Sequence, residues 1–123
     1  MMKNALATIV AVAVAVGCAP ALAQGYPDRP IKLVVPYAPG GSTDLLARSL
    51  AQKMGEGMGQ PIIVENRGGG GGMIGSDFVA RAAPDGYTIV LGTGATHGIV
   101  KFTSKALPYD PVKDFTALTE AVE

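Results

Sequence analysis

Three short runs of β-branched and aliphatic residues, with one helical segment between successive runs, constrain the fold of this chain more than any other feature. The runs cover residues 31–35, 62–64 and 88–91, and proline or glycine borders each of them. Such runs are typical of buried parallel strands. Because strands that alternate with single helices pair in parallel through right-handed crossovers, the sequence predicts an α/β fold with the order β-α-β-α-β.

Helical periodicity fills the two segments between the runs. Ser42, Thr43 and Asp44 are residue types that cap the start of a helix. The apolar stripe that follows recurs at every fourth position and consists of Leu46, Leu50, Met54 and Met58, with Ala47 and Ala51 beside it. This pattern predicts an amphipathic helix of about four turns that Pro61 closes. A second apolar face, made by Ile74, Phe78 and Ala82 with Val79, predicts a second helix that ends at Pro84.

A glycine-rich loop leaves each of the first two strands and leads into a helix. The loops cover residues 36–41 and 68–72, and a third loop at residues 92–98 follows the third strand. A helix start presents unpaired N–H groups and the positive end of the helix dipole, and glycine lets backbone approach a ligand closely. Residues 36–44 contain no Lys or Arg. The loops therefore predict a pocket that holds a small anion, most simply a carboxylate, through backbone amides, with hydroxyls of Ser42, Thr43 and Thr93 as added donors.

Charge and composition exclude several other classes of function. The chain has 10 basic and 10 acidic residues, so it lacks the basic excess that nucleic acids and anionic membranes attract. Its single Cys excludes an internal disulfide framework and a cysteine zinc cluster, and its single His excludes any site that needs two imidazoles. With 48% apolar and 16% charged residues, the chain is not disordered by composition.

The first 23 residues have the pattern of a secretory signal peptide. Lys3 gives a basic start, residues 5–16 are apolar but too few to span a bilayer, and residues 21–23 (A-L-A) form a small-residue cleavage site. The periplasm is the predicted location. Residues 15–18 also form a weak lipobox, which would make Cys18 a lipidated first residue; an uncleaved anchor is a further alternative.

Motifs for nucleotide binding and catalysis are weak. Gly70, Gly72 and Gly75 match G-x-G-x-x-G, but the acidic residue expected about 20 positions later is absent. Ser42 does not lie in G-x-S-x-G, so a hydrolase would depend on the fold bringing His97 to it. No cofactor and no metal site are predicted.

Several side chains have two interpretations. Asp44 is either a first-turn acid that the helix dipole favours or an acceptor for a ligand group. Asn66 and Arg67 either pin the second loop or, for Arg67, attract an anion. Tyr37 either lines a pocket or packs, and Tyr109 and Phe115 are predicted to pack in the core or between lobes.

Several motifs, in order, resemble the Bug-type solute-binding proteins, the periplasmic receptors of tripartite tricarboxylate transporters. They are residues 26–31 (Y-P-D-R-P-I), 35–44 (V-P-Y-A-P-G-G-S-T-D), 59–61 (G-Q-P), 64–67 (V-E-N-R) with the glycine run, 84–88 (P-D-G-Y-T), 91–93 (L-G-T), 107–111 (L-P-Y-D-P) and 114–115 (D-F). The resemblance implies a type II-like periplasmic binding fold, with two lobes that close on a small carboxylate and deliver it to the membrane subunits of the transporter.

The same resemblance implies which residues contact the ligand. They are Tyr37, Ala38, Pro39, Gly40, Gly41, Ser42, Thr43, Asp44, Gly70, Gly71, Gly72, Thr93 and His97. One departure is that the second loop carries only glycine where the family has N-R-P-G-A-G-G. No nucleic-acid partner is expected, and a monomer is.

Family members are much longer than this chain. We therefore expect residues 24–115 to form an incomplete first lobe and residues 116–123 to begin the crossover to a second lobe. Two rival hypotheses remain open: a secreted serine hydrolase that uses Ser42 and His97, and a gene remnant without function.

Overall fold

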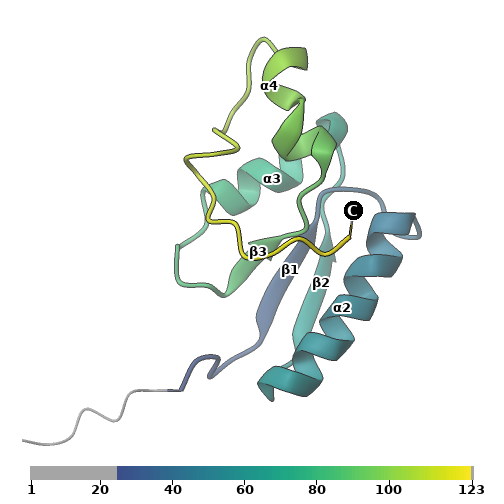
Figure 1. The fold of residues 1–123 in the computed structure, drawn as a ribbon, viewed down its shortest axis with the longest axis vertical. Helices are drawn as coiled ribbons and strands as arrows, with labels where there is room; N and C mark the ends of the chain where they lie inside the picture. Colours follow the sequence, from purple (N-terminus) through teal and green to yellow (C-terminus); the bar gives the residue numbers. More distant parts are fainter. Residues whose placement is uncertain (1–24, 123) are drawn as a thin grey trace, which may run out of the picture.

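A parallel sheet of three strands organises the part of the chain that the structure, a computed structural model, describes: residues 25–122 (Figure 1). The strands are β1 (Ile31–Val35), β2 (Ile62–Asn66) and β3 (Thr88–Val90), in the order β2-β1-β3. The predicted α/β class and parallel pairing are confirmed. The predicted signal peptide and Cys18 lie outside the described residues.

Two helices cover opposite faces of the sheet (Figure 1). Helix α2 (Ser42–Met58) contacts β1 and β2, and α3 (Met73–Ala80) contacts β1 and β3. The chain crosses from β1 to β2 in one direction and from β2 to β3 in the other. Because each crossover is right-handed, this reversal puts the helices on different faces and makes β1 the central strand.

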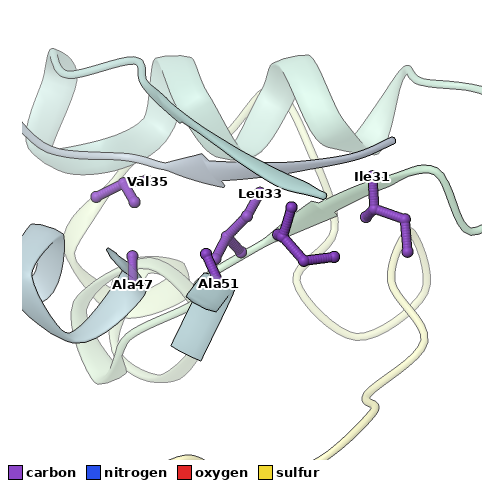
Figure 2. Close-up of a cluster of buried hydrophobic side chains, with 6 residues drawn as sticks. Ile31, Leu33, Val35, Ala47 and Ala51 are labelled. Carbon is purple, nitrogen blue, oxygen red and sulfur yellow. The ribbon is translucent and has the colours of Figure 1, made fainter. Parts of the chain in front are cut away.

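The main apolar core lies between β1 and α2 (Figure 2). Alternate residues of β1, namely Ile31, Leu33 and Val35, point toward this helix and are at most 4% exposed. Ala47 and Ala51 pack against them, and Ile62 completes the cluster. The small alanine side chains let the helix approach the sheet, whereas the leucines and methionines of the predicted stripe are only half-buried.

Helix α3 differs from its prediction in its buried face and its end. Ile74 is 58% exposed, and the helix ends at Ala80 rather than at Pro84. The buried residues of the helix are instead Gly75 and Ser76. A Cβ on Gly75 would lie 2.7 Å from the carbonyl oxygen of Arg67, so only glycine permits this close packing, and close packing then decides which face is buried.

Short turns and an irregular segment follow β3. They include a π-helical turn (η2, Gly94–Gly98) and α4 (Val100–Thr103). Residues 104–122 form turns and irregular structure, without a helix or strand. Tyr109 is 4% exposed and its hydroxyl donates to the carbonyl of Thr96 at 2.7 Å, which confirms the predicted packing role. The predicted crossover at residues 116–123 stays a prediction. No helix of the described part is both long and apolar enough to cross a membrane.

Candidate functional site

Three loops meet at the carboxyl end of the sheet. The first loop (residues 36–41) follows β1, the second loop (residues 67–72) follows β2, and the third loop (residues 91–98) follows β3. The Tyr37 hydroxyl and Thr93 Oγ1 form a 2.7 Å hydrogen bond between the first and third loops. A Cβ on Gly68 would lie 3.2 Å from the amide nitrogen of Ala38, so the second loop also touches the first. In open parallel sheets this switch point beside the central strand is where ligands bind.

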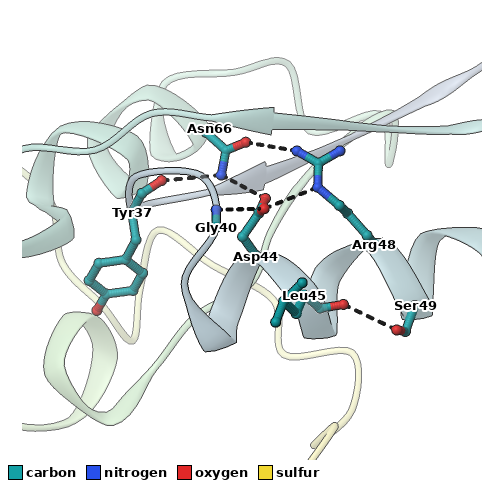
Figure 3. A network of polar contacts seen from close by, with 7 residues as sticks. All are labelled: Tyr37, Gly40, Asp44, Leu45, Arg48, Ser49 and Asn66. Atoms are coloured by element: carbon teal, nitrogen blue, oxygen red, sulfur yellow. Dashed lines mark hydrogen bonds and ion pairs between the residues drawn. The ribbon is translucent and has the colours of Figure 1, made fainter.

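Asp44 holds the first loop in place (Figure 3). Its side chain is buried, and its carboxylate accepts hydrogen bonds from the Gly40 amide at 2.9 Å, from Arg48 Nε at 3.0 Å and from Asn66 Nδ2 at 2.9 Å. Asn66 Nδ2 also donates to the carbonyl of Tyr37 at 3.2 Å. Both carboxylate oxygens are engaged within the protein, which favours a supporting role for Asp44. Its contact with a ligand stays a prediction.

The same three partners shift the titration of Asp44. Hydrogen bonds from Arg48, Gly40 and Asn66 lower its pKa from 3.8 to about 2. They favour the charged form, so they outweigh the cost of burying it.

Acid should therefore remove the contribution of Asp44 to stability. Its pKa is depressed in the folded state, so its stabilising effect is present above pH 3.8 and is lost as the pH falls toward about 2. We expect Asp44→Asn to lower the melting midpoint at neutral pH, and the gap from wild type to shrink across this window. Circular dichroism melts at a series of pH values measure the gap. Ser49→Ala on the same helix is the control, because it adds or removes no titrating group and its effect should not change with pH. A gap between Asp44→Asn and wild type that is also constant with pH would contradict the stabilising role of the Asp44 carboxylate.

Helix α2 begins with backbone amides that have no hydrogen-bond partner in the described part of the chain. Its N-cap residue, Gly41, provides no side-chain cap. Within residues 25–122 the amides of Gly41, Ser42 and Thr43 have no hydrogen-bond acceptor, and Gly41 and Ser42 are exposed. These amides carry the positive end of the helix dipole, so this end of the helix can accept an anion.

The glycine run of the second loop is ordered as a 3-10 turn (η1, Gly70–Gly72). Gly72 is buried with φ +93°, and a Cβ there would lie 2.5 Å from Thr96 Cγ2, so this position requires glycine. The amides of Gly70 and Gly71 have no partner in the described part of the chain. The guanidinium of Arg67 points elsewhere, because it pairs with Glu65 and lies 3.6 Å from the centre of the Phe78 ring.

Thr96 links the residues of the third loop. Thr93 and Thr96 form a reciprocal capping box at the start of η2, and Thr96 Oγ1 lies 2.9 Å from His97 Nδ1. The His97 ring packs against Phe115, with ring centres 4.6 Å apart. Burial lowers the pKa of His97 below its usual value of 6.5. No hydrogen bond joins Ser42 to His97 among the described residues, so the geometry gives the hydrolase hypothesis no catalytic pair. Nor does that part of the chain hold a cluster of three metal-ligating side chains.

All thirteen sequence-predicted ligand residues lie in the three loops or at the start of α2. The prediction missed Thr96 and Arg48, which position these loops. The T-x-x-T spacing of Thr93 and Thr96 is a capping-box signal that could have identified the first of them. Whether the thirteen residues contact a ligand stays a prediction.

A parallel α/β lobe whose loops meet beside the central strand is the architecture of a periplasmic binding protein, and solved proteins of that class share it. A periplasmic transporter structure superposes with a TM-score of 0.70 at 50% identity, over 72% of this chain and 30% of that one. MatC from Rhodopseudomonas palustris with bound malate gives 0.69 at 47% identity, over 74% and 31%. An R. palustris protein with adipate gives 0.68 at 39% identity, over 71% and 29%.

Sequence comparison identifies the family. The model of the tripartite tricarboxylate transporter family receptor matches residues 46–123, and the chain belongs to this family. BugT of Bordetella pertussis is 41% identical over 120 residues, which cover 96% of this chain and 37% of BugT. The chain therefore spans about a third of the length of the curated relatives it matches. The resemblance to Bug-type proteins is confirmed.

Proposed function

We propose that this chain contributes the first ligand-binding wall of a periplasmic receptor that binds a small organic carboxylate and delivers it to the membrane subunits of a tripartite tricarboxylate transporter. The observation that carries the proposal is the set of amides, at the start of α2 and in the adjoining second loop, that have no hydrogen-bond partner in the described part of the chain. These amides are the hydrogen-bond donors that the proposal assigns to the ligand, and residues 36–44 contain no Lys or Arg that could take their place.

Backbone amides suit this task because a carboxylate needs several donors and a positive field. A helix N-terminus supplies both, and its donors do not have to be immobilised when the ligand binds. The relatives with malate and adipate support a carboxylate as the ligand class. In this proposal the ligand contacts are residues 37–43 of the first loop and helix start, Gly70–Gly72, and Thr93.

The protein performs no chemistry in this proposal. Within residues 25–122 the hydrogen bonds of Asp44 go to Gly40, Arg48 and Asn66, and that of His97 goes to Thr96, so neither side chain is hydrogen-bonded to Ser42 as a general base would be. The receptor acts as a monomer, without nucleic acid and without a cofactor, and reaches the periplasm through the signal peptide predicted from its sequence.

Titration calorimetry with malate, adipate and the dimethyl ester of malate tests the ligand class. We expect heat of binding with both acids and none with the ester, because the ester has the same skeleton without the charges. Since the chain spans about a third of its relatives, the titration is run on the chain and on a graft in which residues 25–122 replace the matched segment of MatC.

A cooperative circular dichroism melt first establishes that each sample is folded. A folded graft that releases no heat with either acid would refute the proposal. Equal heat with malate and with its dimethyl ester would show that the site binds neutral molecules as well. That result would refute the proposal that the backbone amides recognise the carboxylate charge.

A further inference from the structure

A continuous chain of hydrogen-bonding side chains connects His97 to Tyr37 across the third and first loops. His97 Nδ1 lies 2.9 Å from Thr96 Oγ1, Thr96 Oγ1 lies 3.3 Å from Thr93 Oγ1, and Thr93 Oγ1 lies 2.7 Å from the Tyr37 hydroxyl. We call these four residues the hydroxyl chain. One end is a titratable imidazole and the other is a tyrosine hydroxyl beside Gly72, next to the unpartnered amides of the second loop.

The distances favour one direction for these hydrogen bonds when His97 is neutral. Thr96 Oγ1 already accepts the Thr93 amide at 3.0 Å and has one proton to donate. Its nearest acceptor is His97 Nδ1, since Thr93 Oγ1 and the Thr93 carbonyl are both 3.3 Å away. The short contact to Thr96 therefore points to the Nε2–H tautomer of neutral His97, in which Nδ1 accepts. Thr93 Oγ1 then keeps a lone pair into which the Tyr37 hydroxyl can donate.

Protonation of His97 reverses the directions. A proton taken from solvent settles on Nδ1, which now donates to Thr96 Oγ1. We infer that Thr96 then turns its own proton toward Thr93 Oγ1, which lies at the same 3.3 Å as the Thr93 carbonyl and also accepts the Thr96 amide at 3.4 Å. With both lone pairs filled, Thr93 must donate its proton to the Tyr37 oxygen. The Tyr37 proton is then free to point away from the chain. No covalent bond changes except the one that takes up the solvent proton.

We propose that His97 is a positioning residue that acts through Thr96 and Thr93. Its charge state decides whether the Tyr37 hydroxyl donates to Thr93 or to a carboxylate bound at the three loops. The proposal rests on the proposed function, since it assigns Tyr37 a donor role toward that ligand. The proposal predicts that protonation of His97 strengthens binding of the carboxylate. Protonation of the carboxylate itself has the opposite effect and weakens binding.

Within the described part of the chain, the groups packed around His97 carry no unbalanced charge that would fix its protonation state. The rings packed on it, Tyr109 and Phe115, carry no charge, and the Tyr109 hydroxyl is engaged by Thr96 O. The ion pair of the adjoining elements joins Lys101 of α4 to Asp110 at 3.1 Å, so these two charges balance each other. Burial is the cause of the lowered pKa of His97, which keeps the imidazole neutral at neutral pH and ready to charge as the pH falls.

The first test needs no ligand. Nitrogen-15 NMR of the chain, labelled at histidine, reports the tautomer of its single His directly. We expect Nε2–H with Nδ1 as acceptor above about pH 8. An Nδ1–H tautomer there would overturn the hydroxyl chain, because Nδ1 would then donate at all pH values. This result is independent of whether any carboxylate binds.

The second test uses malate as the probe and compares wild type with Tyr37→Phe and His97→Asn. By linkage, saturating malate should raise the pKa of His97 in wild type by about one unit, which equals a tenfold tighter binding by the charged form. Tyr37→Phe, which keeps the ring and removes the end of the chain, should abolish this shift. In His97→Asn the amide oxygen can accept from Thr96 at all pH values, and malate affinity should follow only the protonation of malate.

Each outcome separates the two proposals. An unchanged His97 shift in Tyr37→Phe would mean that charge acts through space and would overturn the relay. Malate binding without any shift in wild type would overturn the relay and leave the receptor function intact. Absence of binding by the folded chain and graft would refute the receptor function and with it the donor role of Tyr37.

Discussion

Alanine at position 75 is expected to destabilise the chain by about 2 kcal/mol. A Cβ there would lie 2.7 Å from the carbonyl oxygen of Arg67, 2.9 Å from Pro36 Cα and 3.0 Å from Pro36 Cβ. All three atoms belong to backbone or to a proline ring at the ends of β1 and β2, so none can move aside cheaply. Overpacking of this kind costs about 3 kcal/mol, and the better helix propensity of alanine returns about 1 kcal/mol.

Gly57 provides the matched control for this prediction. It lies in α2, and a Cβ there would have no atom within 4 Å. Gly57→Ala should therefore stabilise the chain by about 0.5–1 kcal/mol through helix propensity alone. Urea unfolding followed by circular dichroism measures both variants. Opposite signs for the two substitutions support the close packing of α3 on the first two loops, and a Gly75→Ala variant as stable as wild type would contradict it.

Local patterns predicted the parts of the fold that local physics determines. Helix α2 begins at Ser42, as predicted, and ends before Gly59, which adopts the left-handed conformation with φ +68°. The predicted capping role of Ser42, Thr43 and Asp44 is wrong in detail, because the N-cap residue is Gly41 and no side chain caps the helix. The strands fall where β-branched runs lie between proline or glycine residues. Because each of these signals is carried by a few neighbouring residues, a single sequence is enough to find the elements and their order.

Contacts between distant segments explain what the sequence did not predict. The periodicity of α3 assigns Ile74 to the buried face, but the packing against Pro36 and Arg67 instead selects Gly75 and Ser76. Hydropathy cannot rank glycine and serine as core residues when the constraint comes from another strand. For the same reason Asp44 remained ambiguous, since Asn66, 22 positions later, completes its network.

A proline at position 42 should weaken carboxylate binding about 10- to 100-fold without disrupting α2. Ser42 is the first residue of the helix, a position that proline favours. The preceding residue, Gly41, is extended with φ −81° and ψ 171°, which is the conformation that a following proline requires. The amide that proline removes has no partner within residues 25–122, so this part of the chain loses no hydrogen bond.

The ligand, in contrast, loses a donor. A hydrogen bond to a charged acceptor is worth about 1.5–3 kcal/mol, which corresponds to the stated loss of affinity. Ser42→Ala is the matched variant, because it removes the hydroxyl and keeps the amide. We expect calorimetry with malate, on the graft into MatC, to show a much smaller loss for alanine than for proline.

The pair of variants separates the two donors of one residue. Equal losses in both would assign recognition to the Ser42 hydroxyl rather than to the backbone. Full affinity in Ser42→Pro, with an unchanged helix signal, would contradict amide recognition at this helix start and leave only the second loop to hold the carboxylate. A large loss confined to proline would place the carboxylate at the start of α2, because the first N–H groups of a helix point out of its N-terminal end along the helix axis.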